Sequence, residues 1–186
     1  MNHTNQSASP LLNKEDCILI VIDMQKRLIP IISQADKAIE NVIRLVKLAK
    51  ILQLPIVVTE QQNLGETVDE IKSEIKEIQP ISKITFSSFG LEEFSSHIGQ
   101  FNRKTLILTG IESHICVTQT ALDAPAEYSI QVVSDAVASR APHNWKIALD
   151  RMQRDGATIT STEMLMYELL RKAGTDEFRA ALPLVK

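Results

Sequence analysis

Apolar and polar positions alternate in blocks along the chain. Short runs rich in Ile and Val are typical of strands that are buried on both faces of a sheet, and they include CILIVID (17–23), IVVTE (56–60) and TLILTG (105–110). Further strands are predicted at 81–84, 130–136 and 157–161. Between them, apolar residues recur about every 3.6 positions, which predicts helices at 36–52, 91–100, 114–124, 144–154 and 162–173, with a short exposed helix within 70–78.

Strands that alternate with helices of this length favour right-handed βαβ units. The pattern therefore predicts an α/β fold with a mostly parallel sheet and helices on both faces. A length of 186 residues is most simply one domain. We expect that domain to span 14–186, after a disordered lead-in over 1–13, because MNHTNQSASP is polar and lacks the pattern of a secretory signal.

Charge and cysteine content narrow the function classes. The net charge is −3, the chain has no run of five basic residues and no long apolar span, so neither nucleic acid nor a membrane is an expected partner. Two cysteines do not make a disulfide framework, and Cys17 opens a run predicted to be buried. These features predict a cytoplasmic protein.

Two reactive side chains follow predicted strands. Asp23 ends the first strand, and Cys116 lies in the first turn of the helix after the fourth. Ligands of open α/β sheets bind at the carboxyl ends of the strands, where the strand order reverses, so the two side chains share a crevice if these strands are neighbours there. A helix N-terminus favours a thiolate, a carboxylate can act as a general base, and Lys83 is a candidate for the balancing cation.

Each of these residues also has a structural interpretation. An Asp after a strand commonly caps a turn, a Cys early in a helix is more often a core residue, and a single Lys is usually solvated. Glu60 and Glu66 flank QQN and are compatible with either a pocket or a surface loop. The sequence has no HExxH, CxxC or phosphate-loop motif, so it gives no metal or nucleotide signal.

Six segments together resemble the isochorismatase-like cysteine hydrolases, and the branch called isochorismatase domain-containing proteins is the most similar. The segments are ILIVIDMQ (18–25), PIVVTEQ (55–61), SKITFSSF (82–89), TGIESHICVTQTALD (109–123), VVSDAVASR (132–140) and GATITSTEMLMYELL (156–170). The resemblance implies a doubly wound six-stranded sheet and a homo-oligomer, which we predict to be a dimer or tetramer.

The resemblance also assigns roles to residues of this chain. It implies a catalytic triad of Asp23, Lys83 and Cys116, the same three residues that the site chemistry proposed. It implies a cis peptide bond between Ile111 and Glu112. It further implies an oxyanion hole formed by the backbone N–H groups of Glu112 and Cys116.

Departures from the family pattern sharpen the expected activity. Nicotinamidases carry an Asp/His metal cluster after the second strand, whereas TEQQNLGET (59–67) has no histidine, so we expect no metal and no cofactor. Isochorismatase itself lacks the nucleophilic cysteine, so Cys116 argues against that reaction. Pro125 interrupts a segment that the branch usually continues as helix, which leaves the length of that helix open.

The sequence thus predicts a metal-independent cysteine hydrolase that cleaves an amide-like C–N bond of a small molecule through an acyl-cysteine. The alternative is a catalytically weak oligomeric binding or scaffold protein of the same fold. Nucleic-acid cleavage is disfavoured by the acidic pI. Possible pocket residues are Gln25, Glu60, Phe86, Phe89 and His114, with core packing equally compatible for the two phenylalanines.

Overall fold

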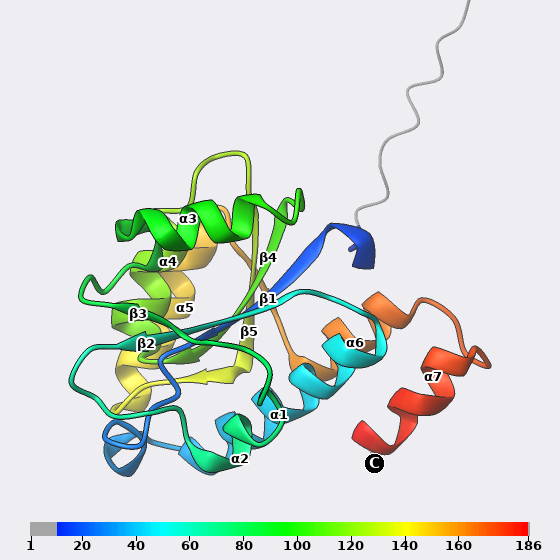
Figure 1. Cartoon of the computed structure of the whole chain (residues 1–186), viewed down its shortest axis with the longest axis horizontal. Coiled ribbons are helices and arrows are strands. Elements are labelled where there is room, and N and C mark those ends of the chain that lie inside the picture. Colours follow the sequence, from blue (N-terminus) through cyan, green and yellow to red (C-terminus); the bar gives the residue numbers. More distant parts are fainter. Residues whose placement is uncertain (1–10, 186) are drawn as a thin grey trace, which may run out of the picture.

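The computed structural model describes residues 11–185 and confirms the predicted α/β fold. Its single six-stranded sheet is parallel throughout and has the order β3-β2-β1-β4-β5-β6 (Figure 1). The strands are β1 (Cys17–Ile22), β2 (Ile56–Gln61), β3 (Ile81–Lys83), β4 (Thr105–Ile111), β5 (Ser129–Ala138) and β6 (Thr158–Thr160). The strand order reverses between β1 and β4, so the sheet is doubly wound.

Helices cover both faces of the sheet. They are α1 (Ala35–Ile51), α2 (Asp69–Lys72), α3 (Glu92–Gly99), α4 (Thr118–Leu122), α5 (Pro142–Arg154), α6 (Thr162–Leu170) and α7 (Asp176–Ala181). One apolar core lies under α1, α2, α6 and α7, and a second lies under α3, α4 and α5 (Figure 1).

The central strand β1 supplies both cores. Its six residues are all buried, with Cys17, Leu19 and Val21 in one core and the intervening isoleucines in the other. Side chains of successive strand residues point to opposite faces, so only an uninterrupted apolar run satisfies both layers of helices. This is why the pattern CILIVI is continuous and not alternating.

The segment after β4 differs from the predicted single helix over 114–124. Ser113–Val117 form one π-helical turn, in which Ser113 O accepts a hydrogen bond from Thr118 Oγ1 at 2.6 Å. The regular helix α4 begins only at Thr118, and it ends at Leu122, ahead of Pro125. Cys116 therefore lies in a wide π turn and not in the first turn of an α-helix.

Two other helix predictions need correction. The predicted helix over 162–173 ends at Leu170, because Arg171 takes a left-handed backbone conformation, with φ of 60°. The separate helix α7 follows and was not predicted. The helix predicted within 70–78 is shorter, α2 (Asp69–Lys72), in which Ile71 is buried and the charged neighbours are exposed.

The domain begins earlier than predicted. Leu12 is held by the C-terminal part of the chain, since its N–H donates to Glu168 Oε1 at 2.9 Å and its carbonyl accepts from Arg171. Asn13 caps the 3₁₀ turn that precedes β1. The predicted lead-in over 1–13 therefore extends at least two residues too far, and its first ten residues lie outside the described part of the chain.

Candidate active site

A buried ion pair lies at the carboxyl edge of β1, β2 and β3. Asp23 directly follows β1, is 0 % exposed and has a φ of 52°. Its Oδ2 accepts a hydrogen bond from Lys83 Nζ at 2.7 Å, and its Oδ1 accepts one from Thr59 Oγ1 at 2.8 Å. The strand register explains why Asp23 and Lys83 lie together. Gln61 of β2 is paired with Lys83 of β3, and parallel strands end at the same edge of the sheet.

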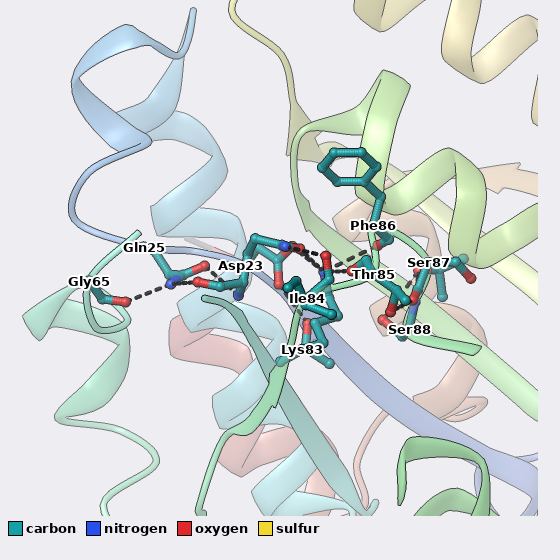
Figure 2. A network of polar contacts seen from close by, with 12 residues as sticks. Asp23, Gln25, Gly65, Lys83, Ile84, Thr85, Phe86, Ser87 and Ser88 are labelled. Atoms are coloured by element: carbon teal, nitrogen blue, oxygen red, sulfur yellow. Dashed lines mark hydrogen bonds and ion pairs between the residues drawn. The ribbon is translucent and has the colours of Figure 1, made fainter. Parts of the chain in front are cut away.

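The side chain of Lys83 is only 1 % exposed, and protein hydrogen-bond acceptors surround its ammonium group in place of water. Besides Asp23, it lies 2.9 Å from Gln61 Oε1 and 3.1 and 3.3 Å from the carbonyl oxygens of Phe86 and Thr85 (Figure 2). A buried charge is tolerated only when it is paired and hydrogen-bonded. The loop after β3 therefore folds around the lysine.

Cys116 lies close enough to this pair to respond to both charges. Burial raises the pKa of its thiol from 9.0 to about 12, and the negative charge of Asp23 and a hydrogen bond to it act in the same direction. The positive charge of Lys83 and a backbone hydrogen bond at Glu112 oppose the rise. The net direction of the pKa shift is upward, so burial and Asp23 oppose the thiolate that a helix N-terminus was expected to favour.

The backbone just before Cys116 has an unusual path. The Ile111–Glu112 peptide bond is cis, the geometry that the resemblance implied, and Gly110 precedes it with a φ of 119°. A Cβ on Gly110 would collide with the backbone of Ile22, so β4 approaches β1 at a distance that only glycine permits.

Arg140 holds the carboxylate of Glu112. Its Nε donates to Glu112 Oε1 at 2.7 Å, its Nη2 donates to the same oxygen, and its backbone N–H donates to Oε2 at 3.0 Å. Burial opposes ionisation of Glu112, but these hydrogen bonds outweigh it and lower the pKa of the carboxyl. His114 Nδ1 lies 3.6 Å from the same carboxylate and 3.0 Å from Ser139 Oγ.

Two of the predicted pocket residues, Gln25 and Glu60, hold the loop after β2 through hydrogen bonds. Gln25 is buried. Its side-chain Nε2 donates to the carbonyl oxygens of Gln61 and Gly65, and its Oε1 accepts a hydrogen bond from the N–H of Gln61. These bonds hold the loop after β2 in place (Figure 2). Glu60 Oε1 accepts hydrogen bonds from the N–H and hydroxyl groups of Thr67, both at 2.7 Å.

The two phenylalanines differ from each other. Phe89 packs edge-on against Phe94, with ring centroids 5.2 Å apart, and also contacts Tyr128. Phe86, by contrast, is 53 % exposed beside the lysine. Phe89 is thus partly buried against the core, and Phe86 is the more exposed of the two.

Sequence reasoning missed three residues that shape the site: Thr59, Gln61 and Arg140. Thr59 and Gln61 are two positions apart at the end of β2, so their side chains share one face of the sheet beside Asp23. In the sequence, these two residues could have been recognised as polar residues two positions apart at the end of an apolar strand. Arg140 ends the quoted segment VVSDAVASR, but the strand pattern does not connect it to Glu112, which is 28 positions away.

Within residues 11–185 there is no group of three or more His, Cys, Asp or Glu side chains arranged to hold a metal ion. No helix in that range is long and apolar enough to cross a membrane. Cys17 and Cys116 are both free thiols.

Comparison with known proteins gives one consistent family. The family model described as "Isochorismatase domain" matches residues 17–164. The secreted isochorismatase effector Isc1 of Phytophthora sojae is 36 % identical over 177 residues, which cover 91 % of this chain and 84 % of that protein. Isochorismatase domain-containing protein 2A of Mus musculus is 32 % identical, with 92 % of this chain and 84 % of that one covered.

Solved structures agree with the sequence comparisons. The MAR1 ribonuclease of Caenorhabditis elegans superimposes with a TM-score of 0.88 at 29 % identity, covering 94 % of this chain and 92 % of that one. The Escherichia coli YcaC product, an octameric hydrolase of unknown specificity, gives 0.88 at 27 % identity, covering 95 % and 90 %. Pseudomonas aeruginosa YcaC, solved with covalent acrylamide, gives 0.87 at 25 % identity, covering 95 % and 92 %. The chain therefore belongs to the isochorismatase family, in the branch of the isochorismatase domain-containing proteins.

Proposed function

We propose that this protein is a metal-independent cysteine hydrolase that cleaves an amide-like C–N bond of a small molecule through an acyl-cysteine intermediate. Membership of the isochorismatase family supports a hydrolase of the cysteine hydrolase type. The observation that carries the finer proposal is the fully buried Asp23–Lys83 ion pair beside the Cys116 thiol. A buried ion pair is weak evidence for stability, so its presence at the carboxyl ends of the strands favours a chemical role.

The first step joins proton transfer to attack. The sulfur of Cys116 forms a bond to the carbonyl carbon while its proton passes to the carboxylate of Asp23. The raised thiol pKa fits this order, because the neutral thiol carries the proton that the reaction needs. Lys83 balances the charge of Asp23 and orients its carboxylate through the 2.7 Å hydrogen bond. The N–H groups of Glu112 and Cys116 stabilise the carbonyl oxygen as it becomes negative, and one such donor contributes about 3 kcal/mol.

The second half of the cycle returns every proton. Asp23 gives its proton to the departing nitrogen as the C–N bond breaks, which leaves a thioester on Cys116 and an ionised Asp23. A water molecule then loses a proton to Asp23 and attacks the thioester carbonyl. The C–S bond breaks, the sulfur takes the proton from Asp23, and the acid product leaves.

Two observations support the nucleophile and the absence of a metal. Acrylamide, which is covalently bound in the Pseudomonas relative, is an electrophile that reacts with thiols. The described residues near Asp23 supply a lysine and neutral oxygens instead of a set of His, Cys or carboxylate ligands. The cation at this site is accordingly the side chain of Lys83.

The test is to trap the acyl group. The protein is incubated with a library of small amides, quenched in acid and digested, and the mass of the Cys116 peptide is measured. Cys17 is the matched control, because it is also a free, buried thiol whose pKa burial raises to about 12. We expect acylation on Cys116 alone, loss of turnover in Cys116→Ala, near-normal turnover in Cys17→Ala, and no effect of chelators. Full turnover by Cys116→Ala would refute the mechanism.

The relative from C. elegans carries the name of a ribonuclease, so RNA cleavage is the second activity to measure. The net charge of −3 gives no electrostatic attraction to phosphates, and we expect no RNA cleavage that depends on Cys116. A scaffold without turnover is distinguished by the absence of any acyl adduct.

Assembly and location each have a direct test. The octameric Escherichia coli relative supports a homo-oligomer here, and light scattering gives the number of subunits. A relative is a secreted effector, so the predicted cytoplasmic location is tested by cell fractionation.

A further inference from the structure

A cavity of about 540 Å³ lies beside the carboxyl half of β5, away from the three proposed catalytic side chains. β6 pairs with β5 only from Gln131 to Val133, so within the described chain residues 134–138 run past the end of β6 without a strand on that side. The first turns of α1 and α5 close the space. Its volume falls within the range of small-molecule sites, roughly 300–1,000 Å³.

Two lysines line this cavity. Lys37 comes from α1 and Lys146 from α5, beside His143, and the side chains of all three are without an ion pair or hydrogen bond within the described part of the chain. The one lining carboxylate, Asp135, already accepts hydrogen bonds from the N–H and hydroxyl groups of Thr162, at 2.8 and 2.9 Å. The two lysines therefore face the cavity without a neutralising partner, which favours an anion.

The inner wall of the cavity is apolar. Trp145 lines it, and the indole N–H of Trp145 is occupied by the carbonyl oxygen of Ser134 at 3.0 Å, so the ring offers carbon atoms to a ligand. Val137, Ala138 and Pro142 continue this wall. An inorganic anion would leave the wall uncovered, and a neutral apolar molecule would leave the lysines unpaired.

We propose that this cavity binds a small anion with a planar apolar body, of the class of aromatic carboxylates. The ring lies against Trp145, and the carboxylate faces Lys37 and Lys146. The site is separate from the proposed hydrolase chemistry, because none of its lining residues belongs to the catalytic set. Its test is accordingly independent of whether Cys116 is acylated.

Trp145 is the only tryptophan in the chain, so its fluorescence reports on this cavity alone. Benzoate is titrated into the full-length protein at constant ionic strength, with benzyl alcohol as the neutral ligand of similar shape. The test variant is Lys37→Gln/Lys146→Gln. The matched control is Lys76→Gln/Lys172→Gln, which removes the same charge from exposed lysines outside the cavity lining.

We expect a saturable change in Trp145 fluorescence with benzoate and a much weaker one with benzyl alcohol. The cavity double variant should bind benzoate at least about fivefold more weakly, as removal of two exposed charges predicts, and the control variant should bind normally. Calorimetry on Trp145→Phe checks that binding does not depend on the reporter. The absence of saturation, equal binding of both ligands, or an equal loss in the two double variants would overturn the proposal.

Discussion

Replacing Asp23 by Asn separates two properties that are usually lost together, turnover and thiol reactivity. Asn has nearly the shape of Asp but carries no charge and cannot take a proton. Turnover should disappear, because the Cys116 proton has no acceptor and the leaving nitrogen no donor. The reaction of Cys116 with iodoacetamide should nevertheless become faster, since the charge of Asp23 is one of the causes that raise the pKa of the thiol.

The size of this effect follows from the site. A neighbouring charge moves a pKa by about 1 to 3. Its loss would lower the pKa of Cys116 from about 12 by that amount and raise the thiolate fraction at neutral pH about 10- to 1,000-fold. A thiolate of lower pKa is a weaker nucleophile, with a Brønsted coefficient of about 0.4–0.5, so alkylation should accelerate about 3- to 60-fold. Lys83, left without its carboxylate, adds to the gain by pairing with the thiolate.

The assay is peptide mass spectrometry of timed iodoacetamide reactions at several pH values. Cys17 in the same sample is the internal control for partial unfolding, because its reactivity should not change unless the variant opens. Removing one partner of a buried ion pair costs about 3–5 kcal/mol, so the measurement is made well below the denaturation midpoint of the variant. Slower alkylation of Cys116 in Asp23→Asn would refute the reasoning, because it would mean that Asp23 promotes the resting thiolate.

Three further predictions test the surroundings of the site. Arg140→Gln removes the side-chain hydrogen bonds to Glu112 and should reduce kcat about tenfold or more, while alkylation of Cys116, which needs no oxyanion hole, stays within about twofold. Gly110→Ala should lower the free energy of unfolding by about 3 kcal/mol or more in urea titrations, because its Cβ has no room; a stable variant would contradict the described approach of β4 to β1. Stability should fall as the pH rises from about 9 to about 12, because the folded state keeps the protons of Cys17 and Cys116 that the unfolded state has lost, and replacing both by Ala should flatten this dependence.

The strands and the meeting of the proposed catalytic residues were accessible from sequence for a physical reason. A strand buried on both faces has to be continuously apolar, so β1 and β4 stand out from their surroundings. Parallel strands end at one edge, so Asp23 and Cys116 converge once β1 and β4 are neighbours. The resemblance then singled out Lys83 among the many lysines of the chain.

Other features depend on tertiary structure and leave little trace in the pattern. One π turn at Ser113–Val117 has nearly the same apolar spacing as one α turn, so periodicity does not separate them. The direction of the Cys116 pKa shift depends on burial, which local sequence does not determine. The structural role of Gln25 depends on the return path of a loop some forty residues later, at Gly65.

Lys83 at the sheet edge has a consequence for how the edge strand of the sheet is held. β3 has three residues, which is too few for backbone hydrogen bonds alone to fix an edge strand, and Lys83 ends it. Its ammonium group ties that strand to Asp23 after β1, to Gln61 after β2 and to the loop carbonyls beyond (Figure 2). The last strand on this side and the ion pair thus depend on the same contacts, so a closed sheet edge and a correctly placed Lys83 occur together.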